Sequence, residues 1–117
     1  MLPETHGSEP EIPFGLIELD AGGTVIFYNP EKNGGSGVLP SDLVGRNFFT
    51  EIPALAQVKE FQNRIRHFRR SHAPPDSFTY TFPADHTYIQ ARILLAHIHE
   101  QSATRRSDSI LVHIRKA

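Results

Sequence analysis

Seven histidines in 117 residues are the first candidates for chemistry in this chain. His97 and His99 are two positions apart in a predicted strand, so their imidazoles share one face of a sheet. With a third imidazole from His113 on the neighbouring strand, they form a pattern that can bind a metal ion. However, His113 has the opposite parity to the apolar residues around it and should face outward, and no carboxylate pattern completes the set. The spacing therefore favours solvent-exposed or edge histidines over a metal site.

Tyr28, at the end of another predicted strand, is the second candidate. Two interpretations remain open. In the first, its ring fills the core and its hydroxyl finds a backbone or side-chain acceptor, as buried tyrosines usually do. In the second, the hydroxyl donates a hydrogen bond to an oxygen atom of a bound acid or phenol.

Signatures of catalysis do not occur in the sequence. There is no G-x-S-x-G, phosphate loop, paired-carboxylate motif or metal signature. Asp42, Glu51 and Glu60 are consistent with helix caps and solvated faces, and Gly34–Gly37 lacks the lysine that a phosphate cradle needs. The chain has no cysteine, which excludes disulfides, thiolate metal ligands, thioether attachment and cysteine nucleophiles. We therefore predict that the protein is not an enzyme.

The composition is that of a soluble globular protein, with 38% hydrophobic and 21% charged residues. A net charge of −1 gives no electrostatic case for nucleic acid. The basic cluster of Arg64, Arg66, Arg69 and Arg70 is interpreted as a solvated helix face or, alternatively, as a partner-docking face. No apolar run approaches the ~18 residues of a membrane span, and Met1–Pro13 lacks a signal-peptide core, so a cytoplasmic location is expected.

The elements that position these residues make one α+β domain over residues 14–117. The polar segment Met1–Pro13 is interpreted as a flexible lead or cap. A polar loop, Gln101–Asp108, separates the last two of five segments with strand-like character. These segments are Phe14–Leu19, Thr24–Tyr28, Ser77–Phe82, Thr87–His99 and Ser109–Arg115. They predict a five-stranded antiparallel sheet.

Alternation in the second of these strands predicts which side chains share a face. A period of two places Ile26 with Tyr28 on one face, and Val25 with Phe27 on the other. We therefore expect Ile26 to lie beside Tyr28.

The helical signals lie between the second and third strands. Asn29-Pro30 predicts a short helix capped by Asn29, and Pro40–Val44 predicts a one-turn helix that Gly45 stops. Gln57–Arg70 is the only long helical pattern. Its apolar stripe consists of Val58, Phe61, Ile65 and Phe68. We expect the short helices and this longer one to pack on one face of the sheet.

Several motifs, taken together, resemble the photoactive yellow protein branch of the PAS domains. They are the strand that ends in Tyr28-Asn29, the turn Gly45-Arg46-Asn47-Phe48-Phe49, the helix start Glu60-Phe61, and Phe78-Thr79-Tyr80-Thr81-Phe82. The resemblance runs from about Phe14 to the C-terminus. It implies the PAS fold, in which the sheet and its covering helices often hold a small molecule between them.

In the photoactive yellow proteins this molecule is a 4-hydroxycinnamoyl group, bound to a cysteine as a thioester. The resemblance places that cysteine position at Leu55, so we expect no covalent 4-hydroxycinnamoyl chromophore. Lys32 stands where the family has a phenolate-binding glutamate, while Tyr28 is retained and Ser36 matches a hydroxyl-bearing pocket position. The loop Gln101–Asp108 is several residues longer than in the family. The resemblance therefore implies the fold and the place of the pocket, but not the photocycle.

Three functions follow from the resemblance. The first is a sensory module that binds a small apolar or aromatic ligand noncovalently, or none, and signals through contacts with a second copy in a homodimer or with a downstream signalling domain. The second is a PAS module used only for dimerisation. The third is a gas or redox sensor with noncovalent haem b, for which His72 or His67 would be the ligand. The residues expected to line the pocket are Ile17, Ile26, Tyr28, Lys32, Ser36, Phe48, Ile52, Leu55, Phe82 and Ile93.

Overall fold

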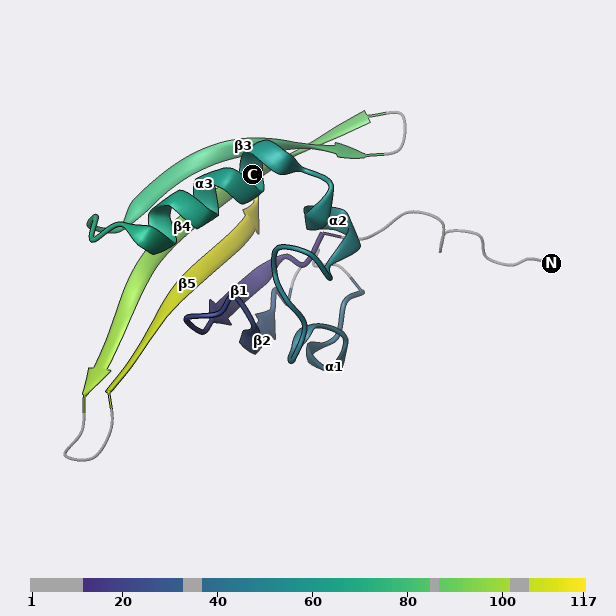
Figure 1. Ribbon diagram of the computed structural model, residues 1–117. Helices are drawn as coiled ribbons and strands as arrows, with labels where there is room; N and C mark the ends of the chain where they lie inside the picture. Colours follow the sequence, from purple (N-terminus) through teal and green to yellow (C-terminus); the bar gives the residue numbers. More distant parts are fainter. Residues whose placement is uncertain (1–11, 33–36, 85–86, 102–105) are drawn as a thin grey trace.

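The sheet and helices follow the order expected from the sequence. The computed structural model describes residues 12–32, 37–84, 87–101 and 106–117. Its strands pair antiparallel in the order β2-β1-β5-β4-β3, and the helices lie on one face of the sheet (Figure 1). The elements are β1 (Gly15–Leu19), β2 (Val25–Pro30), α1 (Pro40–Leu43), α2 (Pro53–Ala56), α3 (Lys59–Arg70), β3 (Asp76–Ala84), β4 (Thr87–Gln101) and β5 (Arg106–Lys116). The predicted α+β fold with a five-stranded antiparallel sheet is confirmed.

A β-bulge in β2 decides which of its residues face the core. The register with β1 passes directly from the pair at Phe27 to the pair at Val25, and leaves Ile26 unpaired. Val25 and Tyr28 are consequently both buried, although they are three positions apart, whereas Ile26 is 47% exposed. The prediction that Ile26 shares a face with Tyr28 is therefore wrong, because one extra residue reverses the alternation.

Proline and glycine fix the ends of the short elements. β2 continues through Pro30, and the next two residues are not helical, so the helix predicted to begin there is wrong for the described residues. α1 agrees with the predicted single turn, and Gly45 follows it at a φ of +94°, a conformation that glycine adopts without strain. The segment after Phe49 contains α2, with Pro53 in its first turn.

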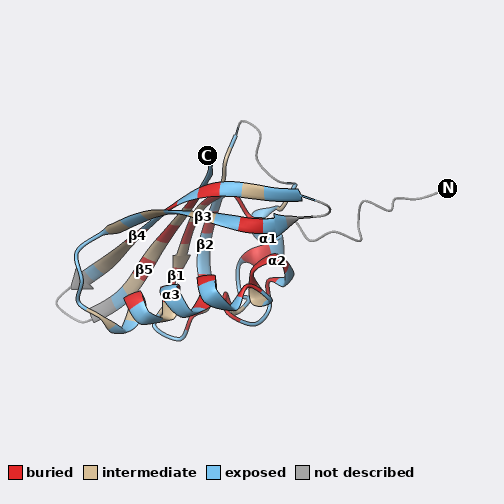
Figure 2. Cartoon of the chain, turned by 90° about the horizontal axis from the view of Figure 1, so that it is seen from above, coloured by how far each residue is buried: buried red, intermediate tan, exposed pale blue. Residues whose placement is uncertain are grey.

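Helix α3 covers the inner face of β3 and β4. The apolar stripe predicted for it is buried, and the Phe61 ring lies 5.0 Å from the ring of Phe82 and 5.3 Å from that of Tyr80 on β3. Buried residues gather where the sheet and the helices face each other (Figure 2). Ile12 and Pro13 belong to the predicted flexible lead but are buried. Within the described ranges, no helix is long and apolar enough to cross a membrane.

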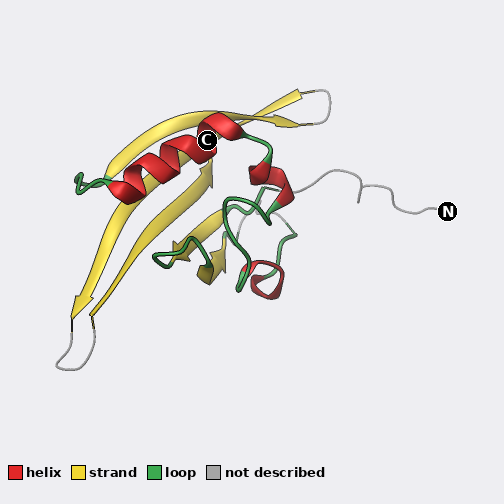
Figure 3. Ribbon diagram, in the orientation of Figure 1, coloured by secondary structure: helices red, strands yellow, loops and turns green. Residues whose placement is uncertain are grey.

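The hairpin of β4 and β5 extends beyond the rest of the sheet as a two-stranded arm. β3 pairs with β4 only as far as Leu95, and β1 pairs with β5 only from Ile110 onward. The pairing of β4 with β5 continues to Gln101 and Arg106, and the arm projects to the lower left in Figure 3. Part of the polar segment predicted as a loop is therefore strand.

Candidate functional site

Most residues expected to line the pocket lie in one hydrophobic core between the sheet and the helices. Seven of them are between 0% and 5% exposed: Ile17, Tyr28, Phe48, Ile52, Leu55, Phe82 and Ile93. The three remaining residues differ. Ile26 is exposed at the bulge, Lys32 is also exposed, and Ser36 lies outside the described residues.

Tyr28 makes the backbone contact of its first interpretation. It is 3% exposed, and its hydroxyl donates a hydrogen bond to the carbonyl oxygen of Phe14 across 2.9 Å. This bond joins the end of β2 to the residue that precedes β1. The phenol therefore helps to close the hairpin, whatever else contacts it.

Leu55 is fully buried on α2, at the position where the resemblance places a chromophore-bearing cysteine. A leucine side chain offers no nucleophile, and the chain has no cysteine at any position. Its isobutyl group packs within the core cluster instead. Covalent attachment of a thioester chromophore is therefore excluded by chemistry.

Gln62 holds the segment that carries these residues, and sequence reasoning missed it. It is 2% exposed on α3, and its side-chain amide donates hydrogen bonds to the carbonyl oxygens of Phe48, at 3.2 Å, and Leu55, at 2.9 Å. One side chain thus ties both Phe48 and α2, which contains Leu55, to α3. A signal was present in the sequence, since position 62 follows Val58 by four residues and precedes Ile65 by three, on the apolar stripe.

A cleft of about 370 Å³ opens between α1 and α2, next to this segment. The residues that line it are Pro13, Gly37, Val38, Asp42, Leu43, Arg46, Glu51, Ile52, Pro53 and Ala54. Leu43, Ile52 and Ala54 are buried and form an apolar floor. Ile52 belongs to the set predicted from the sequence.

The polar residues at the rim of this cleft are engaged in local contacts. Asp42 accepts a hydrogen bond from the backbone nitrogen of Leu39 at 2.9 Å, and its own carbonyl oxygen accepts one from Nε of Arg46 at 2.7 Å. Glu51 accepts a hydrogen bond from the backbone nitrogen of Asn47 at 2.7 Å. An apolar floor with a few fixed polar groups suits a small, largely apolar molecule.

The histidines considered as haem ligands do not face the sheet. His67 is exposed on α3, and α3 ends at Arg70, so His72 lies beyond the helix and is also exposed. Phe61, Ile65 and Phe68 occupy the side of α3 that packs on the sheet. Neither histidine is placed to reach a ligand between the layers.

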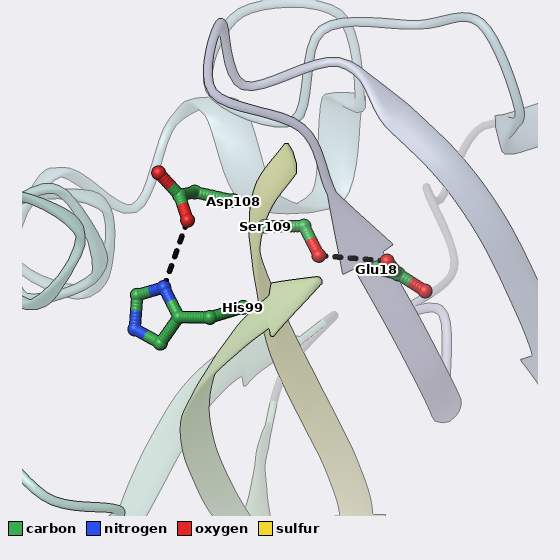
Figure 4. Close-up of polar contacts among 4 residues, drawn as sticks. All are labelled: Glu18, His99, Asp108 and Ser109. Atoms are coloured by element: carbon green, nitrogen blue, oxygen red, sulfur yellow. Dashed lines mark hydrogen bonds and ion pairs between the residues drawn. The ribbon is translucent and has the colours of Figure 1, made fainter. Parts of the chain in front are cut away.

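The strand histidines have structural partners. The ring of His97 stacks on Phe68, with ring centroids 4.4 Å apart, and its Nε2 lies 3.0 Å from the carbonyl oxygen of the same residue. Nδ1 of His99 lies 2.8 Å from a carboxylate oxygen of Asp108 (Figure 4). In the described part of the chain, no three histidine, aspartate or glutamate side chains are grouped as metal ligands would be.

The outer face of the sheet carries a further polar group and a perturbed histidine. The Ser109 hydroxyl donates to a carboxylate oxygen of Glu18 at 2.7 Å (Figure 4). His113 faces outward as predicted, since its neighbours in β5, Val112 and Ile114, are buried. Burial lowers the pKa of His113, and this effect outweighs the Glu31 carboxylate, which raises the pKa.

Known proteins are similar to this chain in sequence and in fold. The photoactive yellow protein of Cereibacter sphaeroides is 35% identical over 71 residues, which cover 61% of this chain and 57% of that protein. The photoactive yellow protein of Halochromatium salexigens is 38% identical over 56 residues, or 48% of this chain and 45% of that protein. The matches thus span about half the length of these relatives.

The comparison of structures supports the fold alone. The PAS-B domain of Drosophila melanogaster Cycle, solved with bound ethylene glycol, aligns with a TM-score of 0.52 at 16% identity, covering 89% of this chain and all of that one. The family described as the PAS fold matches residues 8–115. The chain therefore belongs to the PAS family of sensory domains, and it is a relative of the photoactive yellow proteins that lacks their cysteine.

Proposed function

We propose that this PAS domain is a sensory module that binds a small apolar or aromatic ligand noncovalently in the cleft between α1 and α2. The observation that carries the proposal is the apolar floor of that cleft, formed by Leu43, Ile52 and Ala54. Its volume of about 370 Å³ falls within the range typical of small-molecule sites, about 300–1,000 Å³. Because the chain has no cysteine, a chromophore cannot be attached to it as a thioester.

The elements around the cleft can transmit a change in occupancy. α1 and α2 are single turns, which make few backbone hydrogen bonds of their own. The segment after α1 is joined to β2 by two backbone bonds, from Val25 to Arg46 at 2.9 Å and from Gly45 to Val25 at 2.8 Å. A ligand that binds one arrangement of α1 more tightly would therefore shift the edge of the sheet as well.

The outer face of the sheet is where such a shift could reach a partner. Phe27 on β2 is 46% exposed and Leu94 on β4 is 38% exposed. These are apolar side chains that this face would offer to a second copy or a downstream signalling domain. A module that only associates, without a ligand, is the second candidate function, because the same exposed side chains could contact a partner whether or not a ligand is bound.

Binding is tested with Ala54→Phe, which places a ring in the cleft. The probes are small aromatic acids and phenols, with 4-hydroxycinnamic acid as the first. We expect a saturable rise in the melting temperature of the unmodified protein, because a ligand that binds only the folded state stabilises it. The variant should bind about 10-fold more weakly, a difference of about 1.4 kcal/mol.

Ala73→Phe is the matched control, because Ala73 lines a different cleft beside Ser71 and Pro75. It should bind the probes like the unmodified protein. A flat melting temperature across the whole panel, or equal binding by the two variants, would contradict the proposed site and favour association alone. An absorption band near about 400 nm in the purified protein would instead indicate haem.

A further inference from the structure

Another cleft, of about 370 Å³, lies where the C-terminal end of α3 meets the turn between β1 and β2 and the base of the arm. These three parts lie on the left side of the molecule in Figure 1. The residues that line the cleft are Asp20, Ala21, Arg69, Arg70, His97, Asp108, Ser109 and Ile110. None of them lines the cleft between α1 and α2. A ligand bound here would therefore occupy a separate site.

The lining of this cleft carries charges of both signs. Arg69 and Arg70 supply two guanidinium groups. Asp20 and Asp108 supply two carboxylates. Among the described residues, no ion pair joins either arginine to either aspartate. The positive and the negative groups thus share one cleft without contacting each other.

One arginine and one aspartate of this set are held by other parts of the chain. Nη1 of Arg69 donates a hydrogen bond to the carbonyl oxygen of Ala21. The guanidinium carbon of Arg69 also lies 5.3 Å from the centre of the Phe49 ring. A carboxylate oxygen of Asp108 lies 2.8 Å from Nδ1 of His99 (Figure 4). These two side chains are therefore walls of the cleft.

The other two charged residues keep atoms that a ligand can contact. Arg70 is exposed at the end of α3, and its side chain makes no hydrogen bond, ion pair or ring contact with any residue that the structure describes. Oδ1 of Asp20 accepts hydrogen bonds from the backbone nitrogens of Gly22 and Thr24, both at 2.9 Å. Its Oδ2 atom has no partner in the described part of the chain. The cleft thus offers one guanidinium group and one carboxylate oxygen to a ligand.

We propose that this cleft binds the zwitterion of a free amino acid with a short apolar side chain. The guanidinium group of Arg70 donates to the carboxylate of the ligand, and Oδ2 of Asp20 accepts from its ammonium group. Ala21 and Ile110 are the aliphatic residues of the lining and contact the apolar side chain. A ligand with only one charge would leave either Arg70 or Asp20 unpaired. The proposal does not depend on ligand binding between α1 and α2.

The probe is L-leucine, and its controls are two molecules that each lack one of its charged groups. Isocaproate lacks the ammonium group, and isoamylamine lacks the carboxylate. In an NMR titration of the isotope-labelled protein, leucine should shift the backbone amide signals of Ala21, Ser109 and Ile110 in a saturable way. We expect a dissociation constant of about 0.1–10 mM, because water and salt screen exposed charges. Each control should bind at least about 5-fold more weakly, since it loses one charge-assisted hydrogen bond.

Arg70→Gln removes the positive group that is proposed to bind the ligand carboxylate. This variant should bind leucine about 10-fold more weakly, the loss expected for a hydrogen bond between charged groups. Arg64→Gln is the matched control, because Arg64 lies on the same helix, has a side chain that is 51% exposed and lines a different cleft. It removes the same charge from the protein and should bind leucine within about 2-fold of the unmodified chain.

Asp20→Asn tests the negative group while preserving the turn. Asparagine keeps a side-chain oxygen for the backbone nitrogens of Gly22 and Thr24, but it has no charge to pair with an ammonium group. This variant should lose about 10-fold in affinity for leucine and bind isocaproate like the unmodified protein. Equal binding of leucine and its two controls would mean that the charges of the cleft are only hydrated. That result, the absence of saturable shifts, unchanged leucine binding by Asp20→Asn, or equal binding by the two arginine variants would each overturn the proposal.

Discussion

Replacing Phe61 with alanine should lower the free energy of unfolding by about 3–5 kcal/mol, the range found for buried phenylalanine. Phe61 is fully buried on α3, and its ring lies within 6.3 Å of three others, those of Phe48, Tyr80 and Phe82. It therefore joins the helix to β3 and to the segment after α1 at once. The cavity left by its removal borders all three, and urea denaturation followed by circular dichroism would measure the loss.

Ile26→Ala is the control for this prediction. Ile26 is also a large apolar residue, but it is 47% exposed at the bulge of β2. Its truncation should change the free energy of unfolding by no more than about 0.5 kcal/mol. If the Phe61 variant lost less than about 1.5 kcal/mol, or if the two variants lost similar amounts, the packing of α3 on the sheet would not be the main source of stability.

The sequence predicted α3 well because its pattern depends only on residues within one element. Phe61, Ile65 and Phe68 repeat at the spacing of an α-helix, and all three are buried against the sheet. The five strands could also be predicted from the sequence, since alternation is a local property. The length of the arm could not, because the end of β4 depends on its pairing with β5 and not on the composition of β4.

Ile26 shows where a local pattern is insufficient. A β-bulge results from the pairing of two strands, and β1 must shift by one residue against β2 to create it. Nothing in the alternation of Thr24–Tyr28 records that shift. Lys32 is exposed after β2, which continues to Pro30 where the sequence predicted the start of a short helix.

The candidate site was located only in part. The resemblance directed attention to Ile52 and the segment before α2, and Ile52 lines the cleft there, but this cleft is also formed by α1, through Leu43. Leu43 of α1 and Ile52, which precedes α2, are nine positions apart and line the same cleft. Gly45, at a positive φ, and the hydrogen bonds of Gln62 help to hold this segment. The apolar stripe predicts that Gln62 is buried but not which carbonyl oxygens it binds.

Gln62→Glu should destabilise the fold by about 3–5 kcal/mol at pH 7, as expected when a charge is buried without a partner. In the natural protein the amide nitrogen donates to the carbonyl oxygens of Phe48 and Leu55. A carboxylate at this place would present only acceptors to those two oxygens. Desolvation and this repulsion would both raise the pKa of the new carboxyl above its unfolded value of about 4.3.

The sign of the pH dependence follows from that raised pKa. A carboxyl that is more easily protonated in the folded state supports folding below its unfolded pKa, and this contribution disappears as the pH rises through the folded pKa. The deficit of the variant relative to the natural protein should therefore shrink as the pH falls from the folded pKa toward about 4.3, because the carboxylic acid that forms can donate to one carbonyl. Gln57→Glu is the control, because Gln57 is exposed and bonds to Pro53 in the same way at 3.2 Å. Urea denaturation at pH 7 and pH 4.5 should separate the two variants only at the higher pH. Equal stability at both values would mean that the amide of Gln62 does not hold the segment before α2.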